Sequence, residues 1–228
     1  MSADILDYSA LTADYDEKRY IGAWNELKEE YSRRVFQSLL PLRVDRSLDV
    51  ACGTGRGVLT LAERSRLVVG ADATFEMLAR ARKKTVNTPA CYCSANGAQL
   101  PFRGGTFDLV ACLNFLHLFP DRASKLEFVL EAARVLRPGG TAVFDFENAL
   151  QGLFLGPFRK YFVKDIGYDW PWLMRSCFPR SVFRTVTCRG SNIPFVWRVR
   201  RLRRLESTAC VFPFKYLANR ILVSAVRR

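Results

Sequence analysis

The sequence predicts an α/β fold, in which apolar strands alternate with helices along the chain. An apolar strand end at 48–50 runs into a turn with glycines at 53, 55 and 57, and a helical stretch follows at 58–63. A second apolar strand spans 66–71 and ends in Asp72. The chain has 228 residues, a length at which an α/β fold forms one compact domain with a sizeable core.

A helical segment is expected before the first strand. Apolar side chains recur three and four positions apart, at Trp24, Leu27, Tyr31, Val35 and Leu39. This spacing predicts one face of an amphipathic helix over 24–40.

The glycine-rich turn after the first strand indicates a ligand site. Glycine allows a sharp turn and a close approach of a ligand to the backbone, and the next helix offers unpaired N–H groups at its start. A nucleotide-like ligand binds at this place in α/β sheets, although the glycines would also serve tight packing alone. Asp72 lies 23 residues after Asp49, near the spacing at which such folds place a ribose-binding carboxylate. Its alternative role is the N-cap of the next helix, 74–82.

Five blocks of sequence, in this order, resemble the class I S-adenosylmethionine-dependent methyltransferases, in particular their small-molecule, type 11-like branch. The blocks are Asp49-x-x-Cys52-Gly53-Thr54-Gly55, then Gly70-x-Asp72 with Met77-Leu78, then Leu100-Pro101-Phe102 before 106–110, then Leu116-His117-Leu118, then 134–140 before a strand at 141–146. The resemblance covers about residues 45–147. It implies a Rossmann-like, seven-stranded, mostly parallel sheet with helices on both faces and a C-terminal antiparallel hairpin.

The C-terminal part of that sheet is placed from local patterns. Residues 207–212 and 220–226 alternate well enough to be the last two strands, which would form the hairpin. Residues 180–189 are interpreted as either a strand or an inserted hairpin.

The resemblance implies S-adenosylmethionine as the cofactor. The positions that match its binding residues are Tyr15, Tyr20, Asp49, Ala51, Gly53, Gly55, Asp72, Ala73, Met77, Asn96, Gly97 and Leu113. Ala51 stands where the family usually has glycine, and Asn96 where it has an acid that binds the adenine amino group. Asn96 also fits a simple Asn-Gly turn, and the two tyrosines also fit packing beneath a helix.

The methyl group of a sulfonium is already activated, so the protein has mainly to align donor and acceptor. A general base is needed only for an acceptor that must lose a proton. His117, the one histidine of the chain, is the candidate base, and a hydrogen-bonded structural histidine is its alternative. The seven cysteines are scattered without zinc-site spacing, so we expect no metal and reduced thiols in a cytoplasmic protein.

Charge divides the chain into two unlike parts. Residues 1–150 hold 19 basic and 19 acidic residues, whereas 151–228 hold 16 basic and 3 acidic ones and 14 of the 29 aromatics. In the family the second part builds much of the substrate side. The composition therefore favours a small-molecule or lipid-like acceptor that is anionic or aromatic. Peripheral contact with an anionic membrane, nucleic-acid binding and a plain solvated basic face are the alternatives.

Residues 1–228 are accordingly predicted to form a single methyltransferase domain. Residues 1–40 would be a helical cap, 41–150 the cofactor-binding core and 151–228 the basic, aromatic substrate side. We expect neither a signal peptide nor a membrane-spanning helix, since no stretch of 18 apolar residues exists. A nucleic-acid methyltransferase and a cofactor-binding protein that does not methylate are kept as alternatives. The first is disfavoured because the chain reads Leu113-Asn114-Phe115-Leu116, not Asn-Pro-Pro-Tyr, after the fourth strand.

Overall fold

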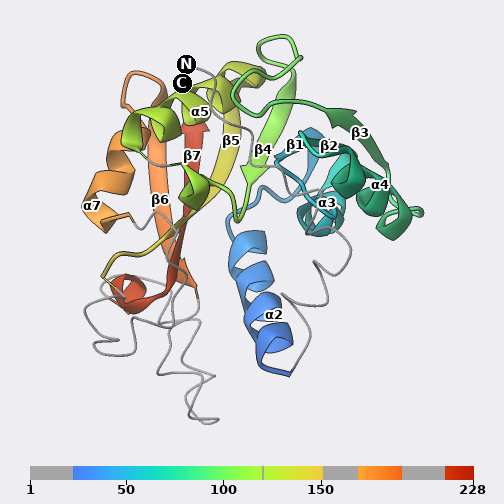
Figure 1. The fold of residues 1–228 in the computed structure, drawn as a ribbon. Coiled ribbons are helices and arrows are strands. Elements are labelled where there is room, and N and C mark those ends of the chain that lie inside the picture. The colour runs from blue at the N-terminus through green and yellow to red at the C-terminus, as the bar shows by residue number, and fades with distance from the viewer. Residues whose placement is uncertain (1–22, 120, 151–168, 192–213) are drawn as a thin grey trace.

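A computed structural model of the chain describes residues 23–119, 121–150, 169–191 and 214–228 (Figure 1). Their centre is a seven-stranded sheet in the order β3-β2-β1-β4-β5-β7-β6. The strands are β1 (Val44–Val50), β2 (Ser65–Asp72), β3 (Ala90–Ser94), β4 (Phe107–Cys112), β5 (Leu136–Glu147), β6 (Phe183–Ser191) and β7 (Arg220–Arg227). The neighbouring pairs among β1 to β5 are parallel, and β7 runs antiparallel to both β5 and β6. This arrangement confirms the predicted mostly parallel sheet.

Helices cover both faces of this sheet, as predicted. They are α2 (Ala23–Gln37), α3 (Arg56–Ala62), α4 (Phe75–Lys84), α5 (Arg122–Val135) and α7 (Pro171–Met174), with short 3₁₀ turns η2 (Leu116–Leu118), η4 (Arg175–Cys177) and η6 (Phe214–Leu217). One buried cluster joins the sheet to α5 and α7, and a second joins it to α2, α3 and α4. Neighbouring strand residues such as Val110 and Ala111 belong to opposite clusters, which is the alternation of side chains that a pleated strand produces.

The helix predicted over 24–40 is α2, which ends at Gln37. Val35 and Phe36 near its end are buried against the second cluster, and Leu39 packs on that cluster from just beyond the helix. Figure 1 shows α2 standing at the carboxyl ends of the parallel strands. The helix therefore closes one side of that edge of the sheet.

The prediction of the sixth strand needs a correction. The strand that pairs with β7 is β6, at 183–191, which sequence patterns left as either a strand or an inserted hairpin. The predicted strand at 207–212 lies outside the described residues. The antiparallel C-terminal pair is thus present, but its first strand comes from an earlier segment. The alternation in β6 is weak because this edge strand buries few of its residues.

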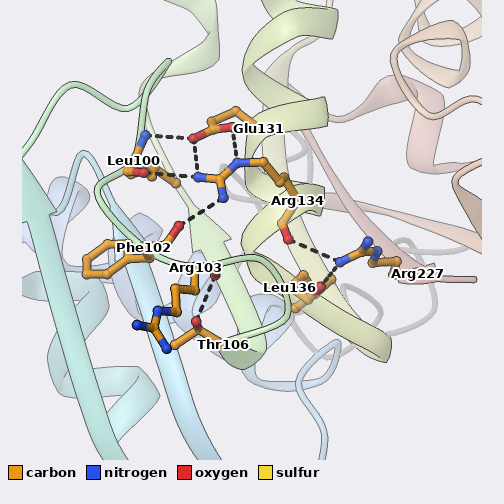
Figure 2. Close-up of polar contacts among 8 residues, drawn as sticks. All are labelled: Leu100, Phe102, Arg103, Thr106, Glu131, Arg134, Leu136 and Arg227. Carbon is orange, nitrogen blue, oxygen red and sulfur yellow. Dashed lines mark hydrogen bonds and ion pairs between the residues drawn. The ribbon is translucent and has the colours of Figure 1, made fainter.

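Two of the family-like blocks contact each other at the amino ends of the parallel strands, at the end of the sheet away from α2 (Figure 2). Arg134, at the end of α5, donates to both oxygens of Glu131, to the Phe102 carbonyl at 2.9 Å and to the Leu100 carbonyl at 3.0 Å. Glu131 in turn accepts from the Leu100 N–H at 2.7 Å. Arg227 of β7 donates to the Arg134 carbonyl at 3.1 Å. These contacts form a structural clamp, which fixes the loop before β4 to α5 and β7.

Candidate functional site

A cavity of about 640 Å³ lies at the carboxyl edge of the sheet, between the strand ends, α2 and α3. This volume is within the range of small-molecule and cofactor sites. Its lining includes Glu26, Glu29, Arg33, Asp49, Ala51, Gly53, Arg56, Gly57, Lys84, Leu113, Asn114, Asp145, Arg220 and Leu222. Ligands of open α/β sheets bind at this edge, so the cavity occupies the expected place.

The three glycines of the first turn have different roles. At Gly53, where φ is +50°, an added Cβ would meet no atom within 4 Å. At Gly55 it would lie 3.0 Å from the Cβ of Ala81 on α4, and at Gly57 it would lie 2.3 Å from Oδ2 of Asp49. Gly55 and Gly57 therefore serve close packing, which was the alternative reading of this turn. Gly53 instead presents bare backbone to the cavity.

Asp49 lies in the buried half of β1 and is 3% exposed. Burial raises the pKa of its carboxyl group to about 8, with a further increase from the nearby Asp72 charge and a decrease from a hydrogen bond donated by the Val58 backbone. A carboxyl group in this position gains its charge at little cost only when a cation arrives. The close approach of α3 that Gly57 permits is what encloses this group.

Asp72, at the end of β2, organises the glycine turn. Its Oδ2 accepts from the Gly53 N–H at 2.8 Å, and its Oδ1 accepts from the Thr74 N–H at 2.9 Å. Burial raises the pKa of Asp72, and these two hydrogen bonds oppose that increase. The N-cap of α4 is Thr74, so the alternative assignment of Asp72 to the N-cap itself is wrong, although Asp72 does bind a backbone N–H there.

Two residues of the cavity wall have left-handed backbones that favour glycine. Ala51 has φ +54°, which explains why a glycine suits this position. Asn114, directly after Leu113, has φ +60°. Its N–H donates to Oδ1 of Asp145 at 2.7 Å, which links the turn after β4 to the neighbouring strand β5. Asp145 is 3% exposed, so a buried carboxylate holds this turn in place.

Arg220, at the start of β7, completes the wall on this side. Its Nη1 lies 3.2 Å from Oδ2 of Asp145, and its Nη2 lies 2.8 Å from Oε1 of Glu147. The three side chains come from neighbouring antiparallel strands, with Glu147 paired directly with Arg220. No predicted site residue belongs to this group. Asp145 and Glu147, two acids at the end of the strand predicted for 141–146, were the only sequence feature that pointed to it.

Within the described residues, the predicted cofactor residues that do not line this cavity are Gly55, Asp72, Ala73, Met77, Asn96 and Gly97. Met77 is buried in α4, and Ala73 is exposed between β2 and α4. Oδ1 of Asn96 accepts from the Ala98 N–H at 2.9 Å, which is the turn role. A Cβ on Gly97 would lie 2.6 Å from the ring of Phe128, which indicates packing. The predicted Tyr15 and Tyr20 lie outside the described residues.

His117 lies in η2, after β4, and is 7% exposed. It is not among the residues that line the cavity. The candidate base is thus buried in the 3₁₀ turn after β4 and does not line the cavity.

Ion pairs hold α2 over the cavity. Glu29 of α2 accepts from Arg56 of α3 at 3.2 Å, and Glu63, just after α3, accepts from Arg33 at 3.1 Å. Ser32 of α2 also lies 3.0 Å from Ser191 of β6, oxygen to oxygen. The helix is therefore fastened on two sides, to α3 and to β6.

The acids and thiols of the described residues form no group of three that would hold a metal ion. Cys52, Cys112 and Cys177 are buried free thiols, and Cys91 is exposed. Burial raises the pKa of the Cys52 and Cys112 thiols. The thiols of Cys52 and Cys112 are accordingly protonated.

The sheet order and the site define an α/β protein that binds a small ligand at the carboxyl edge of a doubly wound sheet. Residues 48–144 match the family model described as a methyltransferase domain. This match, over 97 of the 228 residues, supports the predicted resemblance to the class I S-adenosylmethionine-dependent methyltransferases.

Curated relatives match the same part of the chain. It is 34% identical over 157 residues to a 27-O-demethylrifamycin SV methyltransferase of Amycolatopsis mediterranei, covering 63% of this chain and 55% of the relative. It is 31% identical over 139 residues to a demethylmenaquinone methyltransferase of Mycobacterium marinum, covering 60% and 57%. The chain thus spans little more than half the length of these relatives.

The fold also resembles solved structures over nearly its whole length. A magnesium protoporphyrin IX methyltransferase from Synechocystis PCC 6803, solved with bound SAH, superposes with a TM-score of 0.69. The superposition covers 97% of this chain and 100% of that one, at 15% identity. At this identity the likeness concerns the fold alone.

Proposed function

We propose that this protein is an S-adenosylmethionine-dependent methyltransferase that acts on a small-molecule or lipid-like acceptor. The observation that carries the proposal is the bare backbone of Gly53, which lines the cavity together with Asp49 and donates its N–H to Asp72. The methyltransferase domain at 48–144 and the two small-molecule methyltransferases among its relatives support it.

The site fits this cofactor chemically. A Cβ at position 53 would fill part of the space that a ligand needs, and the chain has none there. S-adenosylmethionine carries a sulfonium and an ammonium, and the buried Asp49 carboxyl group, with its raised pKa, would gain a cationic partner. Asp72 accepts two backbone hydrogen bonds and keeps further lone pairs with which ribose hydroxyls can bond. We propose as its principal contacts Asp49, Ala51, Gly53 and Leu113, which line the cavity, and Asp72, which accepts from the Gly53 N–H beside it.

When bound, the cofactor would supply an electrophilic methyl group on a positively charged sulfur. The residues of the chain would bind it, orient it and exclude water. Asn114, held by Asp145, shapes the cavity wall after β4, and α2 with its ion pairs covers the opening. We propose that His117 is not the general base, because it does not line the cavity.

The acceptor class is proposed from composition. The net charge of +13 resides in 151–228, together with about half of the aromatic residues, which favours an anionic or aromatic acceptor. The basic segments at 151–168 and 192–213 lie outside the described residues. The same ingredients support a cytoplasmic protein in peripheral contact with an anionic membrane. Among the described residues no helix is long and apolar enough to cross a membrane.

Incubation with methyl-labelled S-adenosylmethionine tests the activity. We expect label to pass from the cofactor to an extracted pool of small metabolites and lipids. Label appearing in RNA or DNA instead would favour the nucleic-acid alternative. Tight cofactor binding without any transfer would favour a cofactor-binding protein that does not methylate.

A further inference from the structure

An exposed apolar surface lies on and beside α7. Trp172 is 61% exposed, Leu173 42% and Trp170 38%, and we name these three residues the tryptophan surface. Pro171 and Met174, on the other side of the short helix, are buried. Other large apolar side chains that the described part of the chain exposes, such as Phe75, do not form such a run of neighbouring positions. Figure 1 shows α7 at the margin of the molecule.

The two indole rings are already ordered. Their centroids lie 5.0 Å apart and the ring planes differ by 20°, so the rings stack. Stacking fixes two large side chains that would otherwise lose rotamer freedom on binding a partner. An ordered and exposed aromatic pair is a feature of docking surfaces more than of solvated ones.

The first charged residue that follows this surface in the chain, Arg175, is basic. Between 169 and 191 the chain has four arginines, at 175, 180, 184 and 189, and one acid, Asp169. Arg175, Arg180 and Arg184 are exposed. Asp169 is half-buried and bonded to Lys125 of α5 at 2.7 Å, so its charge is already neutralised. The surface therefore combines tryptophan, leucine and arginine without an exposed acid in this segment.

The surface is tied to the edge of the sheet that holds the cavity. The Asp169 N–H donates to the Glu147 carbonyl at 2.8 Å, and the Ala149 N–H donates to the Asp169 carbonyl at 3.0 Å. Trp170 thus begins one residue after a segment bonded to the carboxyl end of β5. Asp145, two residues before Glu147, lines the cavity.

We propose that the tryptophan surface docks this protein on an anionic lipid bilayer. Tryptophan and leucine insert at the headgroup level, and nearby arginines are attracted to anionic lipids. Nucleic acid would be held by aromatic faces open to successive bases, whereas here the two rings stack on each other. The link to a lipid-like acceptor rests on the proposed function, but the docking itself does not require methyl transfer.

Flotation of the full chain with vesicles tests the proposal. We expect the protein to bind phosphatidylcholine vesicles that contain phosphatidylglycerol, and to bind pure phosphatidylcholine much more weakly. The double variant Trp170→Ala/Trp172→Ala should lose on the order of tenfold or more in vesicle affinity. Arg175→Gln should lose about fivefold. Phe75→Ala, which removes a 67% exposed ring on α4, is the matched control and should bind as the native chain does.

Calorimetry of S-adenosylmethionine on the same variants separates this proposal from the function. Unchanged cofactor affinity with lost vesicle binding is the expected result, and it also shows that the variants are folded. If the native chain does not bind S-adenosylmethionine, the proposed function is wrong, but vesicle binding would still support the docking proposal. Equal vesicle binding by the tryptophan variant and the Phe75 control would overturn the docking proposal. So would tryptophan-dependent binding to an oligonucleotide, or tryptophan-dependent self-association, with no vesicle binding.

Discussion

At the scale of single residues, Asp72 holds the glycine turn, and we propose that it also binds the ribose of the cofactor. Asp72→Asn replaces one acceptor oxygen with an N–H group that faces a backbone N–H of Gly53 or Thr74. We expect the free energy of unfolding to fall by about 1–3 kcal/mol, and cofactor affinity to fall roughly ten- to a hundredfold. Thermal melting and calorimetry on one preparation measure both. Loss of stability with unchanged affinity would leave Asp72 a purely structural residue.

His117 gives a second prediction at this scale. Because His117 is buried and does not line the cavity, His117→Gln should lower turnover only a few fold, with cofactor affinity unchanged. A general base would instead cost about 100-fold or more. The measurement is kcat against pH for both proteins, once a methyl acceptor is known. A large loss together with a vanished acidic limb of the pH profile would restore His117 as the base.

Individual residues of the site differ in how readily sequence predicts them. Asp49, Gly53 and Asp72 follow from a local pattern, because strand, turn and helix are consecutive in the chain. Arg220 could not be predicted, since it reaches the cavity through pairing of β7 with β5, 73 positions from its partner Glu147. Gly97 and Asn96 matched the family positions, but their contacts in the structure are those of packing and of a turn.

At the scale of elements, the clamp around Arg134 joins α5, β7 and the loop before β4 (Figure 2). Arg134→Ala would leave the Leu100 and Phe102 carbonyls and the Glu131 carboxylate without this donor. We expect the free energy of unfolding to fall by about 1–3 kcal/mol, while cofactor affinity in the folded protein is unchanged. Denaturant unfolding and calorimetry test this. If the variant is fully folded and still binds the cofactor more weakly, the clamp also shapes the site.

The elements themselves were predicted where their pattern is local and strong. The α2 helix and the strands up to β5 follow from periodicity and from the resemblance. The β6 strand was uncertain because it is an edge strand with few buried residues, and its pairing with β7 depends on contacts far apart in the chain. An edge strand with few buried residues shows only a weak hydrophobic alternation.

At the scale of the whole molecule, the charge state of the site couples ligand binding to pH. Burial raises the pKa of Asp49 to about 8, so the folded protein holds a proton there that the unfolded chain has lost above pH 4 or so. Stability from this group therefore falls as the pH rises from about 4 to about 8. The folded protein favours the protonated form of Asp49, and a bound cation should favour the carboxylate instead.

We therefore expect S-adenosylmethionine binding at pH 7 to release a proton from Asp49. Calorimetry in two buffers with different protonation enthalpies measures the number of protons released. Asp49→Asn keeps the shape of the side chain but cannot release a proton, so fewer protons should be released when this variant binds the cofactor. The same proton release in both proteins would mean that Asp49 does not respond to the cofactor.

We propose above all that the cofactor packs directly on the backbone of Gly53, and a comparison of two variants tests this contact. Asparagine tolerates a left-handed backbone, so Gly53→Asn can fold while it places a side chain in the cavity. Gly105→Asn makes the same change at another left-handed glycine, φ +73°, whose Cβ position is also roomy and which lies outside the cavity lining. We predict that calorimetry will show native S-adenosylmethionine affinity for Gly105→Asn and a loss of at least tenfold, on the order of 1.4 kcal/mol, for Gly53→Asn. Equal, native affinity in both variants would contradict this account of the site.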